Sequence, residues 1–233
     1  MKATPEMKFE KFARNIPFLA CLSDAELADL RKVTIEKRFA KKRVVFHEED
    51  KTEYFYFIYS GKVKVIQTSA DGRERMMAIH KKGDFFGEMA ILDGKAAPAT
   101  VVAMEDCEIG FISKADFERY LLNNPRALRE IVLMLCERLR EAWLMIKVTS
   151  FADTEHRIRA VLKNISDHFG IRDKRGTILA VKLTHKDIAH FASTSRETAT
   201  RFLRRFSKDG EIEILDQKYI LLKPEFFLEA PLP

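Results

Sequence analysis

Hydrophobic and polar residues alternate differently in the two halves of the chain, and this difference predicts two kinds of architecture. Between residues 44 and 112, short β-branched and aromatic runs are separated by turn dipeptides such as Ser60-Gly61 and Asp71-Gly72. Strands that follow one another at this spacing are typical of a small antiparallel barrel, and glycine supplies the positive φ that such turns need. We therefore expect a jelly-roll-like β-barrel with strands at residues 44–46, 54–59, 63–66, 76–79, 100–104 and 109–112.

A long amphipathic helix is predicted to follow Asn124-Pro125, because proline is favoured in the first turn of a helix. Its apolar residues recur at alternating steps of four and three, which is the spacing of a parallel coiled-coil seam. The same stripe would also suit a helix packed on its own domain, so both interpretations stay open. In the dimer interpretation the interface consists of Leu128, Ile131, Val132, Leu135, Leu139, Ala142, Trp143 and Ile146.

The last third of the chain predicts a helix, a tight turn, a second helix and a hairpin, which is the order of a winged helix-turn-helix. The expected elements are a helix at 153–169, a charged turn at 172–176, a strand at 177–183, helices at 185–192 and 196–209, and wing strands at 211–215 and 218–222. The fold class is therefore α+β. We divide it into a jelly-roll domain at 1–123, a long helix at 124–150 and a winged helix-turn-helix at 151–233.

One face of the second helix carries the groups that read DNA bases. Ala199, Phe202, Leu203 and Phe206 lie at helical spacing and predict a buried stripe. The opposite face then presents Arg196, Glu197, Thr200 and Arg201. Arginine can donate two hydrogen bonds to guanine and glutamate can accept one from cytosine in the major groove. The plainer interpretation is a solvated helix with an ion pair between Glu197 and Arg201.

The charge distribution favours a polyanionic partner for this part of the chain. Residues 157–208 hold thirteen Lys and Arg against four acids, an excess larger than the net charge of +6 of the whole chain. Phosphate groups are contacted by hydroxyls, ammonium groups and amides at helix starts. The expected phosphate contacts on double-stranded DNA are Thr184, Lys186, Ser195, Thr198, Arg204 and Lys218.

Composition argues against several other classes of protein. Hydrophobic residues make up 46% and charged residues 33%, and no apolar stretch is long enough to span a membrane. Residues 1–14 lack the apolar core of a secretory signal, so we expect a cytoplasmic protein with no membrane partner. The three cysteines are scattered and form no CxxC pair. We find no metal-ligand spacing, no phosphate loop and no nucleophile with an oriented base, and assign no catalytic or metal-binding residue.

Two motifs resemble the CRP/FNR family of transcription regulators over nearly the whole chain. The first is Thr184-His185-Lys186-Asp187-Ile188-Ala189, followed by Ser195-Arg196-Glu197-Thr198. The second, residues 83–94 followed by 99–103, is similar to the family's phosphate-binding cassette. The resemblance implies a homodimer that reads a TGTGA-type palindrome through Arg196, Glu197 and Arg201. It also implies an activator that contacts RNA polymerase, and an effector that shifts the dimer between arrangements.

The cassette departs from the family where cyclic nucleotide would bind. Relatives that bind it carry an Arg-Ser pair where this chain has Ala97-Pro98, while Glu88, the usual ribose partner, is present. A buried phosphate without a guanidinium would be unpaired, and this argues against cAMP unless Lys95 folds inward. The expected effector pocket comprises Phe86, Gly87, Glu88, Met89, Ala97, Pro98, Ala99 and Thr100.

The identity of the effector stays open at this point. The alternatives are a different small molecule, a haem or gas sensor, or no ligand. His47, His80 and Cys107 are candidate haem ligands, although each also suits an ordinary surface or core position. A further alternative is a regulatory ligand-binding module whose helix-turn-helix contacts proteins instead of DNA.

Overall fold

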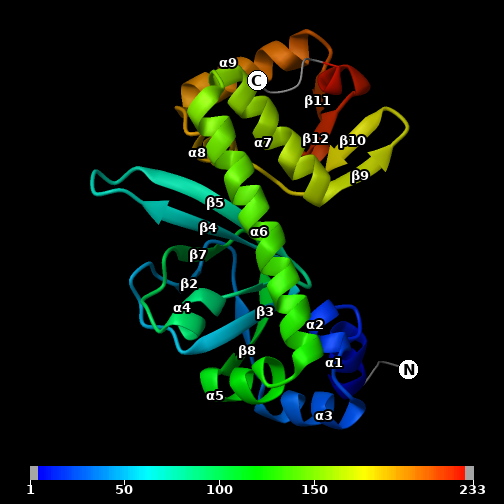
Figure 1. Ribbon diagram of the computed structural model, residues 1–233. Helices are drawn as coiled ribbons and strands as arrows, with labels where there is room; N and C mark the ends of the chain where they lie inside the picture. The colour runs from blue at the N-terminus through cyan, green and yellow to red at the C-terminus, as the bar shows by residue number, and fades with distance from the viewer. Residues whose placement is uncertain (1–4, 229–233) are drawn as a thin grey trace. The chain divides into compact units, whose positions relative to one another are not determined.

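The computed structural model describes residues 5–228 and divides the chain into two compact units, Met1–Arg138 and Leu139–Pro233. Helix α6 (Pro125–Phe151) passes from the first unit into the second as one unbroken helix (Figure 1). No helix among the described residues is long and apolar enough to cross a membrane.

Unit 1 contains eight antiparallel strands in two four-stranded sheets, which confirms the jelly-roll architecture. The strand orders are β1-β8-β3-β6 and β2-β7-β4-β5. All six predicted runs form strands, and two strands were missed. The bounds are β1 (Ile35–Phe39), β2 (Val44–Phe46), β3 (Tyr54–Ser60), β4 (Lys62–Thr68), β5 (Glu74–Lys81), β6 (Phe85–Phe86), β7 (Thr100–Ala103) and β8 (Cys107–Ser113).

Two glycines make the tight connections of this barrel. Gly72, in the β4–β5 hairpin, has φ of 79°, a conformation that side chains disfavour. At Gly61, between β3 and β4, an added Cβ would lie 2.6 Å from the carbonyl oxygen of Asp106. The backbone therefore approaches β8 there more closely than any other residue would allow.

Aromatic rings fill the core of unit 1. Phe55, Phe85 and Phe117 stack at centroid distances of 4.6–5.1 Å, and Phe18 meets two of them edge to face. Burial of such rings is the main favourable term in the stability of a small domain. The helices around this core are α1 (Pro5–Ala13), α2 (Pro17–Ala20), α3 (Asp24–Val33), α4 (Glu88–Asp93), α5 (Lys114–Phe117) and the π-helical turn Glu118–Leu122.

Two of these helices begin at residues whose side chains cap them. Ser23 and Glu26 form a reciprocal capping box at the start of α3, and the Ser113 side chain accepts a hydrogen bond from the amide of Asp116 at α5. Each cap satisfies amides that a helix start leaves without an intrahelical partner.

Unit 2 has the winged helix-turn-helix order, with strand lengths that differ from those expected. Its sheet has the order β11-β12-β10-β9. The bounds are α7 (Thr154–Phe169), β9 (Gly170–Asp173), β10 (Gly176–Leu179), α8 (His185–Phe191), α9 (Arg196–Lys208), β11 (Ile212–Ile214), β12 (Ile220–Leu222) and two 3-10 turns, Asp216–Lys218 and Pro224–Phe227.

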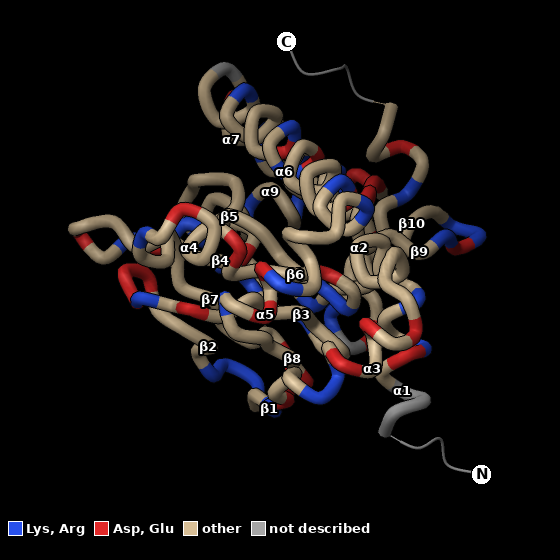
Figure 2. The backbone as a smooth tube through the Cα atoms, turned by 60° about the horizontal axis from the view of Figure 1, so that its bottom comes forward, with Lys and Arg blue, Asp and Glu red and all other residues tan. Residues whose placement is uncertain are grey.

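The expected charged turn at 172–176 is wrong in part, because its first residues belong to β9, which pairs with β10 through residues such as Arg172 and Thr177. The expected strand at 177–183 ends at Leu179. Figure 2 shows that the tip of the β9–β10 hairpin carries charges of both signs, and there Arg175 pairs with Asp173 and Glu213. Strand pairing therefore replaces the loop that charge alone suggested.

Candidate nucleic-acid interface and effector pocket

Helix α8 and the turn after it set the direction of α9. Thr184 and Asp187 form a capping box at the start of α8. Ser193, in the turn, has φ of 50°, an uncommon conformation for a residue with a side chain. Ser195 then caps α9 by accepting a hydrogen bond from the amide of Thr198 at 3.1 Å. The helix-turn-helix geometry is thus fixed by local hydrogen bonds.

Helix α9 packs through most of the predicted stripe. Ala199, Leu203 and Phe206 are buried as expected. Phe202 is only partly buried, which corrects the prediction that it belongs to the buried stripe. Its ring lies at the border of the buried stripe: it contacts Phe206 at a centroid distance of 6.1 Å, and the guanidinium groups of Arg201 and Arg205 lie over it at 5.4 and 5.0 Å.

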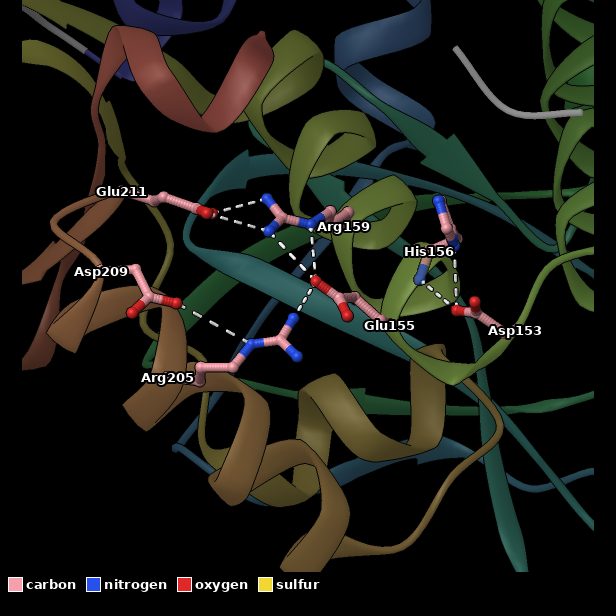
Figure 3. Close-up of polar contacts among 7 residues, drawn as sticks. All are labelled: Asp153, Glu155, His156, Arg159, Arg205, Asp209 and Glu211. Carbon is pink, nitrogen blue, oxygen red and sulfur yellow. Dashed lines mark hydrogen bonds and ion pairs between the residues drawn. The ribbon is translucent and has the colours of Figure 1, made fainter. Parts of the chain in front are cut away.

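An ion-pair cluster, buried at Arg159 and exposed at Arg205, connects α9 to α7 and to Glu211, which directly precedes β11. The Arg159 guanidinium, 4% exposed, pairs with Glu155 at 3.2 Å and with Glu211 at 2.6 Å (Figure 3). It also lies 4.2 Å from the centroid of the Phe206 ring. Arg205 of α9 pairs with the same Glu155. These arginines are therefore used inside unit 2.

The opposite face of α9 is exposed and unpaired. Arg196, Glu197, Arg201 and Arg204 are exposed, and within the described part of the chain none of them forms an ion pair. The ion pair between Glu197 and Arg201 that the sequence also allowed is therefore not formed in this structure. These guanidinium groups have no internal carboxylate partner, so they remain available to bind an external anion.

Thr200, also expected to read bases, is partly buried and already hydrogen-bonded. Its hydroxyl donates to the carbonyl of Arg196 at 2.8 Å and lies 2.8 Å from Nδ1 of His185. Burial first, and then the charges of Arg196 and Arg204, lower the pKa of His185. Thr200 therefore links α8 to α9, and only part of its surface remains for DNA.

Four of the residues expected to contact phosphate lie at the starts of α8 and α9, whereas Arg204 lies further along α9 and Lys218 lies in the wing. Thr184, Lys186, Ser195 and Lys218 are exposed, and Thr198 is partly exposed. The Thr184 hydroxyl donates to Asp187 at 2.7 Å, and the Ser195 hydroxyl donates to that of Thr198 at 3.0 Å. Because the caps use these hydroxyls, the first amides of α9 are the better donors to a phosphate.

The expected effector pocket contains an ion pair that was not predicted from the sequence. Glu88 begins α4 directly after Gly87, whose φ is 83°. Its carboxylate is buried and pairs at 3.0 Å with Arg138 of α6. Arg138 also donates to the carbonyl of Phe85 and lies 4.2 Å from the centroid of its ring. Helical periodicity could not predict this pair, because Arg138 and Glu88 are fifty residues apart in the sequence.

The cassette offers a buried apolar surface where the phosphate of a nucleotide would need a cation. Ala97 and Ala99 are buried, and Ala97 packs in the barrel cluster with Phe86 and Val101. The remaining pocket residues are more open: Pro98 and Met89 are exposed, and Gly87 and Thr100 are partly exposed. Lys95 is exposed with its Nζ 3.8 Å from Asp93, so it does not fold inward.

The three candidate haem ligands lie in different surroundings. His47 is exposed. The Cys107 thiol is buried and donates to the carbonyls of Glu105 and Lys62, and burial raises its pKa, which disfavours the thiolate. Burial, with a smaller effect of Arg138, lowers the pKa of His80 to about 3. Within the described residues, no group of three His, Cys, Asp or Glu could hold a metal ion.

Helix α6 presents part of the predicted stripe to solvent. Leu128, Val132, Leu139, Trp143 and Ile146 are exposed apolar side chains, and Trp143 is 65% exposed. Ile131 is 1% exposed and belongs to the core of unit 1, and Leu135 packs partly against that core. Ile131 therefore stabilises its own unit and does not extend the exposed stripe.

Comparisons with known proteins agree with both units. Residues 36–124 match the family model described as a cyclic nucleotide-binding domain, and residues 156–229 match a Crp-like helix-turn-helix domain. The cyclic AMP receptor protein of Thermus thermophilus is 29% identical over 190 residues, which cover 81% of this chain and 85% of that protein.

Solved structures give the same fold. A CooA variant from Carboxydothermus hydrogenoformans has a TM-score of 0.72 and 26% identity, covering 84% of this chain and 86% of that one. CooA is described as a CO-dependent transcription factor. The c-di-GMP responsive regulator CLP of Xanthomonas campestris has a TM-score of 0.73 and 22% identity, covering 86% of this chain and 99% of that one.

Proposed function

This chain belongs to the CRP/FNR family of DNA-binding transcription regulators, and from this premise we propose that it acts as a homodimer that reads a TGTGA-type palindrome. In this proposal residues 1–123 sense an effector, residues 124–150 form the dimer helix and residues 151–233 bind DNA. RNA polymerase is the further partner that the family resemblance implies. The observation that carries the proposal is the exposed, unpaired face of α9.

The reading of bases is assigned to Arg196, Glu197 and Arg201. Their side chains project from one helix face, and no carboxylate of the described chain neutralises the two guanidinium groups. Each bidentate contact between an arginine and a guanine contributes about 1–3 kcal/mol of discrimination. Thr200 is given a smaller part, because its hydroxyl is engaged by His185 and by the backbone.

Dimerisation is assigned to the exposed stripe of α6. Five large apolar side chains on one helix leave water when a second copy packs against them, and their spacing is that of a parallel two-helix seam. Two copies of α9 would then reach half-sites about one turn of DNA apart, which is how dimeric helix-turn-helix proteins read palindromes.

The effector is proposed to be a molecule other than cAMP. A cyclic phosphate placed at Ala97 would meet a buried methyl group, and a buried anion without a partner costs several kcal/mol. The names of the similar proteins already include a cyclic AMP receptor, a CO-dependent factor and a c-di-GMP responsive regulator. The shared fold therefore accommodates chemically different effectors.

Binding of purified protein to TGTGA-type palindromes and to random duplexes of equal length tests the main proposal. We expect tighter binding to the palindrome, with one dimer bound per site. Equal affinity for both duplexes at the same salt concentration would refute base-specific reading. Mass analysis and an absorption spectrum of the same preparation test the effector, and we expect no haem absorption and no thermal stabilisation by cAMP.

A further inference from the structure

Unit 1 holds a second cavity that takes no part in the function proposed above. Its volume is about 1040 Å³, and it is lined by residues of α1, the edge strand β1, Tyr59 of β3 and the β5–β6 turn. Small-molecule sites have volumes of roughly 300–1,000 Å³. None of its lining residues belongs to the expected effector pocket or to α6, so it is a separate site in the same unit.

One wall of this cavity is aromatic. Phe9 and Phe12 of α1 meet the ring of Tyr59 edge to face, at centroid distances of 6.3 and 4.5 Å. Ile16 continues the apolar surface. Such a wall buries the apolar body of a ligand and favours flat or extended hydrocarbon groups.

The hydroxyl of Tyr59 points to a ligand with an acceptor group. Its oxygen is shielded from solvent and forms no hydrogen bond with any described residue. Burial, and then the charge and the nearby acceptor oxygens of Glu36, raise the pKa of Tyr59, so the phenol stays protonated and acts as a donor. Arg31 pairs with Glu36 and opposes its effect, which reduces the repulsion that a ligand carboxylate would meet there. A buried hydroxyl without a partner costs free energy, which an acceptor on a ligand would recover.

The charged groups of the lining favour an anion. Five Lys and Arg side chains belong to it, against Glu36 and Glu108; the basic positions of β1 can be followed in blue in Figure 2. Arg31 pairs with Glu36 at 3.3 Å and Arg38 pairs with Glu108 at 2.7 Å. Both carboxylates are thus used, whereas among the described residues Lys11 and Lys82 have no carboxylate partner.

We propose that this cavity binds an amphipathic carboxylate, with its hydrocarbon body against Phe9, Phe12 and Tyr59. The carboxylate accepts a hydrogen bond from the Tyr59 hydroxyl and faces the basic rim that contains Lys11 and Lys82. The site adds a second ligand to the regulator, one that contacts neither Glu88 nor the cassette.

Isothermal titration of the full-length protein with decanoate and 2-naphthoate tests this site. We expect one carboxylate bound per chain, and binding of 1-decanol at least about tenfold weaker because it lacks the charge. Tyr59→Phe keeps the ring and removes only the hydroxyl, and should weaken the binding of the carboxylates roughly tenfold. The double variant Lys11→Gln, Lys82→Gln should weaken it by a similar factor.

Tyr56→Phe is the matched control, because it makes the same change on the same strand outside the cavity. It should leave carboxylate binding unchanged, and circular dichroism of each variant reports on folding. The site is overturned if neither carboxylate binds, if decanol binds as tightly as decanoate, or if Tyr59→Phe has no more effect than Tyr56→Phe.

Discussion

Unit 2 uses arginine in two opposite ways on two sides of α9. On the inner side, Arg159 and Arg205 pair with Glu155 and Glu211, and Arg159 is almost fully buried between the rings of Phe206 and Phe226. On the outer side, Arg196, Arg201 and Arg204 are exposed and have no carboxylate partner in the described chain. The same side chain thus supports folding on one side and remains available for DNA on the other.

This difference shows that the number of arginines does not by itself identify a DNA-binding surface. The excess of thirteen Lys and Arg over four acids counts Arg159 and Arg205 as available, yet Glu155 and Glu211, which neutralise them, lie just outside the counted segment. The two sets of arginines differ in one respect: those on the inner side pair with carboxylates of unit 2, and those on the outer side do not.

The largest effect is expected for Arg159→Met. It leaves Glu211 and Glu155 close together with one cation fewer, and breaking a buried pair by removing one partner costs about 3–5 kcal/mol. Urea denaturation should show this loss in the free energy of unfolding. Arg204→Met is the matched control on the outer side, with an expected change within about 0.5 kcal/mol. Equal stability of the two variants would remove the distinction between the sides.

Arg201→Ala should weaken DNA binding and leave stability unchanged, which is the reverse of the result expected for Arg159→Met. Fluorescence anisotropy should show that affinity for the matched palindrome falls by about 1–3 kcal/mol per half-site, while the free energy of unfolding stays within about 0.5 kcal/mol of wild type. Arg205→Ala serves as comparison and should lower stability without relaxing discrimination. An equal loss on matched and random duplexes would assign Arg201 to phosphate binding instead.

Acidification should weaken the ion pairs on the inner side of α9 and leave the outer side unchanged. Burial raises the pKa of Glu155, but the hydrogen bonds from Arg205 and Arg159 outweigh it and hold the pKa below its ordinary value of 4.5. The stabilisation is complete above that value and is lost as the pH falls through the lowered pKa. Glu155→Gln should therefore remove about 1 kcal/mol at pH 7 and flatten the fall of stability below pH 4.5. An unchanged acid profile would contradict this assignment.

Lys218→Gln should have the smallest effect, confined to the outer side. The residue is exposed at the wing and was assigned to phosphate. Loss of one phosphate contact weakens binding to all sequences alike and lowers the slope of log affinity against log salt by about 1. Titrations at several salt concentrations on both duplexes measure it. A change limited to the palindrome would instead assign Lys218 to base reading.

Most strands and helices could be predicted because their residues carry the pattern locally. Runs of β-branched and aromatic residues indicate the barrel strands. Capping residues indicate where α3, α8 and α9 begin. Strand β1 could not be predicted, because Ile35 to Arg38 are all exposed and show no alternation. It forms because it pairs with β8, whose residues are between 68 (Phe39 with Cys107) and 76 (Ile35 with Phe111) positions away in the sequence.

In the candidate sites too, some features follow from the local sequence and others depend on contacts between residues that are distant in the sequence. The exposed positions Arg196, Glu197 and Arg201 of α9 follow from helical spacing and could be named in advance, whereas the partial burial of Thr200 depends on its contact with His185 of α8. The burial of Ile131 and the pairing of Arg138 with Glu88 depend on which side of α6 faces the barrel. Helical periodicity describes the faces of α6 but not the partner of each face, and that is decided by packing.

The pairing of Glu88 with Arg138 has a consequence for signalling. Arg138 is the last residue of unit 1 and belongs to the helix whose exposed side chains are assigned to dimerisation. An effector that bound Glu88, as proposed for this pocket, would compete with the Arg138 guanidinium and so change a restraint on α6 at this position. In that proposal one ion pair connects occupancy of the pocket directly to the helix assigned to dimerisation.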